Sequence, residues 1–292
     1  MSPVLKIWMN GELVDKPDAT VSVYDHGLLY GDGAFEGIRA YNGRVFKLGS
    51  HLRRLANSLE RIRLKPRYSS DELDQAIRAT LNANDLSDAY IRLVVTRGAG
   101  TLGLHPFKCP VPNTFIITDH IQLYPDELYD RGMKVIVAKR PRNDPRALDP
   151  AIKSLNYLNN ILAKIEAIDA GVLEAIMLNP AGEVAECTGD NIFAVNGESV
   201  TTPPASAGIL EGVTRAFVME LCRDLEIPVS EKKMTLAELK GADEVFLTGT
   251  AAEIIAVTQI DDDEIGPGTP GPVTDRLLGE FRRRVSDQAP ED

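Results

Sequence analysis

The chain has 292 residues, of which 43% are hydrophobic, so it is long enough for about two globular domains with buried cores. Its net charge of -11 argues against nucleic acid or an anionic membrane as a partner, and no apolar stretch approaches the roughly 18 residues of a membrane span. The three cysteines are far apart and lack disulfide or zinc spacing, so we expect reduced thiols in a cytoplasm and no metal site.

The first third of the chain predicts hairpins followed by two helices. Asn10-Gly11 and Asn42-Gly43 each stand between β-prone residues, a pattern typical of tight two-residue turns joining antiparallel strands. Leucine and isoleucine then recur at helical spacing after Ser50 and again after Ser70, which predicts two amphipathic helices.

Strands are expected next at 90–96 and 113–118. In the first of them Tyr90 and Arg92 alternate with the apolar residues Ile91, Leu93 and Val95. Tyr90 and Arg92 therefore share a face of the strand that is free to bind polar groups. The charged, Pro-containing stretch that follows is the expected domain crossing. We therefore predict a small domain over 1–120, a linker over 121–131 and a larger domain over 132–292.

The larger domain is predicted to mix helices and strands. Strands are expected at 133–138, 174–178, 191–195 and 244–248, and a helix at about 213–225. Another helix is expected to place Leu155, Leu158, Ile161, Leu162, Ile165 and Ile168 along one side and to end at Gly171. The Gly/Pro segment 266–272 is expected to be a loop, and the tail after Val285 to be frayed.

Two charged residues stand where cofactor chemistry is possible. Lys153 lies between a Pro-rich loop and an apolar helix, where a partly dehydrated amine could bond to an aldehyde cofactor; a solvated helix lysine is the alternative. Glu186 precedes a Gly-containing turn and a strand, so its carboxylate could keep a pyridine nitrogen protonated. An ordinary surface acid is the alternative there.

Two Gly-containing turns are candidate phosphate sites. Segments 208–215 and 248–253 combine free backbone N–H groups with threonine hydroxyls, a chemistry that suits a phosphate at a helix N-terminus. Each segment can equally be an ordinary helix cap. The sequence contains none of the common Gly-rich phosphate loops, the His-Glu-x-x-His zinc motif or the Gly-x-Ser-x-Gly motif.

The order of these segments resembles the class IV, or fold type IV, pyridoxal-phosphate enzymes. The four matching segments are Ile-Lys-Ser-Leu-Asn-Tyr at 152–157, Glu-Cys-Thr-Gly-Asp-Asn at 186–191, Leu-Glu-Gly-Val-Thr-Arg at 210–215 and Gly-Thr-Ala-Ala-Glu-Ile at 249–254. Tyr-Gly-Asp-Gly-Ala-Phe-Glu-Gly-Ile-Arg at 30–39 is similar to a segment of the branched-chain aminotransferases within that class. The resemblance extends from about Ile7 to Arg284.

The resemblance implies a two-domain α/β fold with pyridoxal 5'-phosphate in the interdomain cleft. It makes Lys153 the catalytic residue that holds the cofactor covalently. The other implied cofactor contacts are Arg54, Tyr157, Glu186, Leu210, Val213, Thr214 and Thr250. The implied substrate contacts are Phe35, Gly37, Tyr90, Arg92, Thr250 and Ala251, with Tyr30 offered to a neighbouring subunit's site. Leu210 could instead be an ordinary core leucine, and Arg92 could end a surface strand in a salt bridge.

The activity implied is transamination of leucine, isoleucine and valine with 2-oxoglutarate by a homodimer or higher homo-oligomer. A D-amino-acid transaminase and an aminodeoxychorismate lyase of the same fold are the alternatives, because they share the Gly-Asp-Gly at 31–33 and the four-residue step from Lys153 to Tyr157. The string Phe-Glu-Gly-Ile-Arg at 35–39 favours the branched-chain type. A catalytically silent binding protein is a third possibility, although it would not need the lysine, the acid and a phosphate site together.

Overall fold

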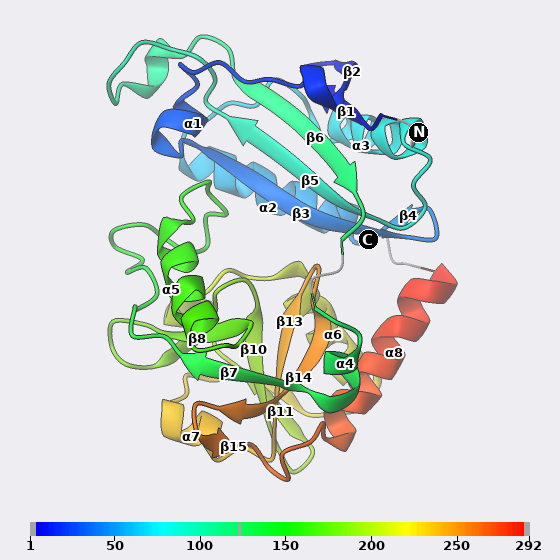
Figure 1. Ribbon diagram of the computed structural model, residues 1–292, viewed down its shortest axis with the longest axis vertical. Helices are drawn as coiled ribbons and strands as arrows, with labels where there is room; N and C mark the ends of the chain where they lie inside the picture. Colours follow the sequence, from blue (N-terminus) through cyan, green and yellow to red (C-terminus); the bar gives the residue numbers. More distant parts are fainter. Residues whose placement is uncertain (1–3, 122–123, 289–292) are drawn as a thin grey trace. The chain divides into compact units, whose positions relative to one another are not determined.

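The computed structural model describes residues 4–121 and 124–288, which divide into two compact units. Unit 1 contains the described residues of 1–121, 152–156 and 285–292, and unit 2 those of 122–151 and 157–284. Each unit has a sheet of its own (Figure 1). The chain therefore returns to unit 1 for the five residues around Lys153 before it continues through unit 2.

The sheet of unit 1 has six strands in the order β2-β1-β6-β5-β3-β4, with every neighbouring pair antiparallel. The strands are β1 (Lys6–Met9), β2 (Glu12–Asp15), β3 (Gly33–Tyr41), β4 (Arg44–Val45), β5 (Ala89–Thr96) and β6 (Asn113–Asp119). Both predicted hairpins are confirmed, because Asn10 and Asn42 adopt positive φ angles of 53° and 50° between paired strands.

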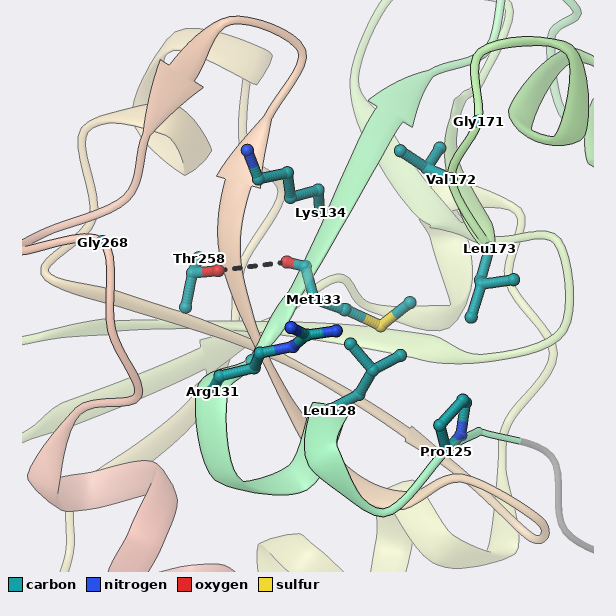
Figure 2. A pocket seen from close by; sticks show the side chains of 11 residues that line it. Pro125, Leu128, Arg131, Met133, Lys134, Gly171, Val172, Leu173, Thr258 and Gly268 are labelled. Carbon is teal, nitrogen blue, oxygen red and sulfur yellow. Dashed lines mark hydrogen bonds between the residues drawn. The ribbon is translucent and has the colours of Figure 1, made fainter.

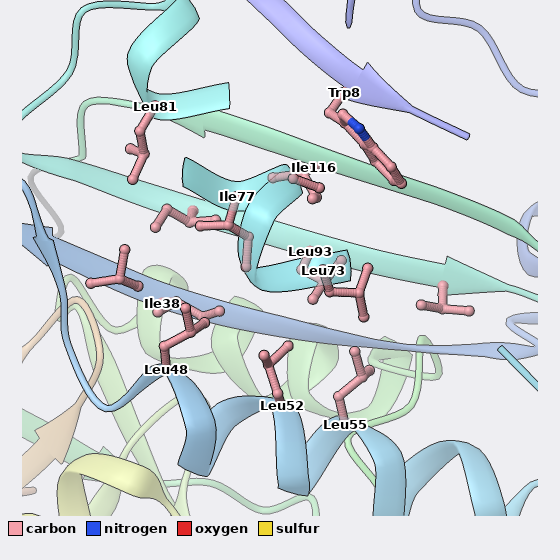
Figure 3. Packing of buried hydrophobic residues seen from close by; sticks show 14 of the residues in the cluster. Trp8, Ile38, Leu48, Leu52, Leu55, Leu73, Ile77, Leu81, Leu93 and Ile116 are labelled. Carbon is pink, nitrogen blue, oxygen red and sulfur yellow. The ribbon is translucent and has the colours of Figure 1, made fainter. Parts of the chain in front are cut away.

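One face of this sheet is covered by two helices. They are α2 (Leu48–Arg61) and α3 (Ser70–Ala83), which confirm the two predicted helices; α3 begins at a capping box of Ser69 and Glu72. Short turns α1 (His26–Tyr30), η1 (Lys16–Asp18) and η2 (Pro106–Lys108) complete the unit. Figure 3 shows leucines of both helices packed against Ile38, Leu93 and Ile116 of the sheet.

The strand alternation gives the sheet of unit 1 two different faces. Ala34, Ile38 and Leu93 point into the helix-covered core. Neighbouring residues on β3 and β5 therefore point to the opposite face, which α2 and α3 do not cover. The predicted alternation of 90–96 is thus confirmed.

The sheet of unit 2 is mixed, with the order β12-β11-β10-β13-β14-β7-β8-β9, and β15 pairs with β14. Its strands are β7 (Met133–Val137), β8 (Glu174–Leu178), β9 (Val184–Cys187), β10 (Asn191–Asn196), β11 (Ser199–Thr202), β12 (Val229–Glu231), β13 (Glu244–Gly249), β14 (Glu253–Ile260) and β15 (Asp263–Glu264). The pairs β11–β12, β14–β7 and β7–β8 are parallel. All four strands predicted for this part of the chain are present.

The helices of unit 2 pack on this sheet. They are α4 (Glu127–Arg131), α5 (Leu158–Asp169), α6 (Val213–Asp224), α7 (Leu236–Lys240) and α8 (Pro272–Gln288), with a 3-10 turn η3 (Ala205–Ala207). The expected loop and frayed tail are wrong in part, because α8 begins at Pro272 and continues past Val285. Phe281 of α8 packs edge-on against Phe217 of α6, which explains why this polar-looking segment is helical. Among the described residues, no helix is long and apolar enough to cross a bilayer.

Helix α5 buries an unexpected side. The predicted helix forms over Leu158–Asp169, and Gly171 follows its end with a positive φ of 77°. Leu155, which was expected along its side, lies instead before the helix in the segment that belongs to unit 1, where its N–H donates to the Gly33 carbonyl. The residues that pack on the sheet, however, are Ala163 and Ala167, which join a cluster with Ala175 and Met177. Its large aliphatic side chains instead point away from unit 2.

Candidate functional site

Lys153 is held on unit 1 by its backbone. Phe35 N–H donates to the Lys153 carbonyl (3.0 Å), Leu155 N–H donates to the Gly33 carbonyl (3.0 Å), and Lys153 N–H donates to Ser58 Oγ (3.1 Å). Residues 153–155 therefore lie along the first half of β3. The Lys153 Nζ stands 4.8 Å from the centroid of the Phe35 ring.

Phe35, Gly37, Tyr90 and Arg92 come together on the face of the sheet opposite α2 and α3. The Arg92 guanidinium lies 4.6 Å from the centroid of the Phe35 ring, and its Nη2 donates to Tyr90 Oη at 2.8 Å. Gly37 leaves space for the Tyr90 side chain, because a Cβ at this position would come within 2.1 Å of Tyr90 Oη and the ring would have to move. Phe35 and Tyr90 thus form an aromatic surface that also carries the Arg92 guanidinium.

Arg54 faces the other side of β3, where it binds a buried acid. Glu36 Oε1 accepts from Arg54 Nε (2.9 Å), and Glu36 Oε2 accepts from Arg54 Nη2 (2.7 Å) and from His51 Nδ1 (2.8 Å). Burial alone would raise the pKa of Glu36, but the Arg54 charge and the hydrogen bonds of both partners outweigh it and hold the pKa at about 2. Glu36 thus fixes the direction in which the Arg54 guanidinium points.

His51 is the third member of this cluster and is fully buried. Burial lowers its pKa below the usual value despite the hydrogen bond to Glu36, so the imidazole is neutral at pH 7 and donates through Nδ1. Among the described residues its Nε2 has no hydrogen-bond partner. His51 thus contributes a hydrogen bond to Glu36, and Arg54 contributes a paired positive charge.

Tyr30 closes the short helix α1 and is partly exposed. Its hydroxyl accepts from Gly103 N–H (3.0 Å), and its ring packs edge-on against His26. These contacts fix the ring near the 97–112 loop of the same unit.

Glu186 is buried in unit 2, and its carboxylate accepts three hydrogen bonds. Its Oε1 accepts from Arg142 Nε (2.8 Å), and its Oε2 accepts from Asn191 Nδ2 (3.0 Å) and from the backbone N–H of Leu210 (3.0 Å). Asn160 of α5 in turn contacts Arg142 at 3.3 Å. The carboxylate is therefore held in one position, and the surface-acid alternative is wrong because Glu186 is only 5% exposed.

The α6 N-terminus presents Val213 and Thr214, both buried, in its first turn. Its N-cap residue is Gly212, which has no side chain to accept a hydrogen bond from the first backbone N–H groups of the helix. Leu210 is half-buried two residues earlier. Thr250 and Ala251 form the turn between β13 and β14, and the buried Thr248 Oγ1 beside that turn has no partner among the described residues.

Asp190 adds a buried acid next to this turn. Its Oδ2 accepts from Tyr124 Oη (2.9 Å), and its Oδ1 lies so close to Gly249 that a Cβ there would come within 1.9 Å. Burial and the negative charge of Glu174 raise the pKa of Asp190 to about 7. The β9–β10 turn and the β13–β14 turn are thus packed against each other.

A separate cavity of about 520 Å³ in unit 2 contains none of the predicted site residues. Figure 2 shows its lining, which comes from α4, the start of β7 and the segment after α5, with Arg131 and Lys134 as its two cations. The candidate site therefore rests on the arrangement of the predicted side chains rather than on this cavity.

Comparison with known proteins assigns the family. A sequence model described as amino-transferase class IV matches residues 33–260. The chain belongs to the class IV aminotransferases. The family and the mixed α/β fold expected from the sequence are thereby confirmed.

This class IV aminotransferase has relatives with two different substrate names. A Methanocaldococcus jannaschii protein, provisionally named branched-chain-amino-acid aminotransferase, is 48% identical over 95% of this chain and 96% of its own length. The D-alanine aminotransferase of Staphylococcus epidermidis is 35% identical over 97% of this chain and 99% of its own. The structure of the Thermobaculum terrenum branched-chain amino acid aminotransferase in its PLP form has a TM-score of 0.88 at 33% identity, covering 100% of this chain and 96% of that one.

Several residues that contact the predicted ones were not singled out from the sequence. Glu36, His51, Arg142 and Asn191 orient predicted residues, and Arg39 pairs in register with Tyr90. Strand alternation could have placed Arg39 on the face of Phe35 and Gly37. No local signal identifies Arg142, since it is 44 residues from its partner Glu186.

Proposed function

We propose that this chain is a pyridoxal-phosphate-dependent aminotransferase that acts on branched-chain L-amino acids with 2-oxoglutarate as the amino acceptor. The observation that carries the proposal is the environment of Phe35. Its ring contacts the Lys153 ammonium on one hand and the Arg92 guanidinium on the other, at 4.8 and 4.6 Å from the centroid. The amine that we propose to be reactive thus lies beside an apolar surface that also carries a guanidinium able to bind a carboxylate.

The donor set suits pyridoxal phosphate. Lys153 supplies the amine, and Glu186 is a buried carboxylate able to hold a proton on a pyridine nitrogen. In unit 2, the α6 N-terminus with Thr214, and the hydroxyl of Thr248 without a partner among described residues, are suited to a phosphate. In unit 1, Arg54 is proposed as a further phosphate contact. Tyr157, Leu210 and Thr250 are proposed as further contacts, and the class to which the chain belongs includes a relative solved with this cofactor in place.

Each of these side chains has a definite task in the proposed reaction. When bound, the cofactor withdraws electrons from the α-carbon of an attached amino acid. The Lys153 amine accepts the proton from the substrate α-carbon and later returns one, acting as base and then acid. Glu186 is proposed to keep the pyridine nitrogen of the cofactor protonated. Arg142, Asn191 and the Leu210 N–H hold both of its carboxylate oxygens in place.

The substrate contacts follow from the wall of unit 1. Phe35 and Tyr90 are proposed to accept the aliphatic side chain of leucine, isoleucine or valine, and Gly37 leaves room for the Tyr90 hydroxyl. Arg92 is proposed to meet the second carboxylate of 2-oxoglutarate, since a guanidinium fork suits a carboxylate. Ala251 and Thr250 are proposed to meet the α-carboxylate through their turn, and Tyr30 to serve the site of a neighbouring copy in a homodimer.

Separate half-reactions test the proposal. Addition of L-leucine to the cofactor-loaded protein should change its absorbance spectrum, and 2-oxoglutarate should reverse the change. In Lys153→Ala the change and the borohydride-stable link to the cofactor should both disappear while the circular dichroism spectrum stays native, because the side chain packs on Phe35 and not in the core. Transamination near the wild-type rate in Lys153→Ala would reject the assignment.

D-alanine is the competing substrate, because a D-alanine aminotransferase is among the relatives. The same spectral assay with D-alanine in place of L-leucine decides between them. If D-alanine reacts faster than L-leucine, the branched-chain assignment is wrong while the class of enzyme stands.

A further inference from the structure

The cavity in unit 2 combines an apolar lining with two positive charges (Figure 2). Its volume of about 520 Å³ lies in the range of small-molecule binding pockets, roughly 300–1,000 Å³. The apolar part of its lining comes from Pro125, Leu128, Met133, Val172 and Leu173. None of the residues that we propose as cofactor or substrate contacts lines it, so the proposed transamination does not account for this cavity.

The two cations of the cavity have no acid as a partner. Arg131 ends α4, and Lys134 lies in the first part of β7. Within residues 4–121 and 124–288 neither side chain forms an ion pair or a hydrogen bond, although the chain has 43 acidic residues against 32 basic ones. One acid, Glu264, approaches the cavity at Gly268, where an added Cβ would lie 3.5 Å from its carboxyl carbon. The two free cations therefore favour an anionic ligand, and Glu264 disfavours a second negative charge on its side of the cavity.

The side of the cavity that α4 forms is held in place by contacts with the sheet and with α8. Tyr129 Oη donates to the Ala252 carbonyl (3.1 Å), and the Arg282 guanidinium lies 4.9 Å from the centroid of the Tyr129 ring. Gly132, with a φ of 74°, turns the chain from α4 into β7. It passes Thr258 so closely that a Cβ would come within 2.4 Å of Thr258 Cγ2. The cavity is therefore formed before a ligand binds, which reduces the free-energy cost of binding.

We propose that this cavity binds a medium-chain aliphatic monocarboxylate. The carboxylate meets Arg131 and Lys134, and a guanidinium is well suited to that contact. The alkyl chain lies on the apolar lining, where Figure 2 shows the Met133 thioether directed toward Leu173. Inorganic phosphate would leave this lining in contact with water, and a dicarboxylate would place its second charge against the lining or near Glu264. The proposal does not depend on which amino acids the enzyme transaminates.

Methyl NMR of the cofactor-loaded protein, labelled with ¹³C at its methionine methyl groups, tests the proposal. The Met133 signal reports on this cavity, whereas the signal of Met9, in β1 of unit 1, serves as the reference. Titration with octanoate should shift the Met133 signal until it saturates and leave that of Met9 in place. Octanamide, which has the same chain without the charge, should bind about tenfold more weakly, and so should succinate. An unshifted Met133 signal, or octanamide or succinate binding as tightly as octanoate, overturns the proposal.

Variants of the lining separate this cavity from other places where octanoate binds. Arg131→Gln and Leu173→Asp change exposed side chains of the lining, and each should weaken octanoate binding about tenfold, the first by loss of a charged contact and the second by repulsion. Arg223→Gln is the matched control, because it removes the same charge from an exposed position of unit 2 outside the cavity and should bind as wild type does.

Unchanged affinity in both lining variants overturns the proposal. If either variant loses its native circular dichroism, the comparison of octanoate with octanamide on wild type still decides. The Met133 signal does not depend on turnover, so the outcome of this experiment is separate from that of the proposed transamination.

Discussion

Replacement of Glu36 by glutamine tests the buried cluster beneath the sheet of unit 1. Glu36 is fully buried, and its pKa is lowered from 4.5 to about 2, with burial opposing and Arg54 and His51 producing the shift. At about 1.4 kcal/mol per pKa unit, ionised Glu36 contributes about 3 kcal/mol to the free energy of unfolding. Glu36→Gln, which is neutral at every pH, should lose about that amount at pH 7.

The pH dependence has a definite sign. Because the folded pKa is the lower one, the contribution of Glu36 is present above pH 4.5 and is lost as the pH falls towards 2. Urea unfolding of wild type and Glu36→Gln, measured at several pH values from 8 to 3, should therefore show a difference that shrinks below pH 4.5. A difference that is constant across this range, or that is under about 1 kcal/mol at pH 7, would refute the reasoning.

Asp74→Asn is the matched control for this experiment. Asp74 also pairs with an arginine, Arg78, but both side chains are 40% exposed. Surface pairs of this kind contribute only about 0.3–0.5 kcal/mol. The control should therefore unfold almost as wild type does at every pH.

Three further predictions concern the remaining acids and the substrate cation. Glu186→Gln should retain the cofactor but lose at least about a hundredfold in transamination rate, because an amide cannot hold the pyridinium; a rate within a few fold would reject the role. Arg92→Ala should impair the half-reaction with 2-oxoglutarate more than that with leucine, by roughly 1.5–3 kcal/mol in single-turnover absorbance, and equal losses would assign Arg92 to the shared carboxylate or the scaffold. Asp190, whose pKa is raised to about 7 by burial and Glu174, stabilises the fold below pH 4 and loses this effect as the pH rises through 7. Between pH 5 and pH 8 the melting temperature of wild type should therefore fall further than that of Asp190→Asn. Equal falls would contradict this prediction.

Local patterns predicted most elements but not the role of their surfaces. The turn at Asn42-Gly43, the helix that contains Leu52 and the strand that contains Ile91 were each predicted from the residue pattern over a few neighbouring positions. The same spacing identified the apolar side of α5. It could not tell that Ala163 packs on the sheet while Ile165 is exposed, since the spacing does not say which side of the helix is buried.

The residues of the candidate site were likewise predicted only in part. Lys153 and Glu186 stand in segments with a recognisable order, so the sequence alone singled them out. The sequence alone could not single out Glu36, His51 and Arg142. A buried charged or polar side chain is identified by its partners, and the fold brings these together from distant positions. Helix α8 was not predicted, although its apolar residues recur at helical spacing among the charges, namely Val273, Leu277, Leu278, Phe281 and Val285.

The return of the chain to unit 1 at residues 152–156 makes the two units inseparable as genetic modules. A gene fragment that stops at residue 121 would lack the segment whose backbone pairs with Gly33 and Phe35, and so would leave that edge of β3 open to pairing with other chains. During synthesis this edge is likewise completed only after about 30 residues of unit 2 have been made. A single recombination crossover at residue 121 therefore separates most of unit 1 from the five-residue segment that carries Lys153.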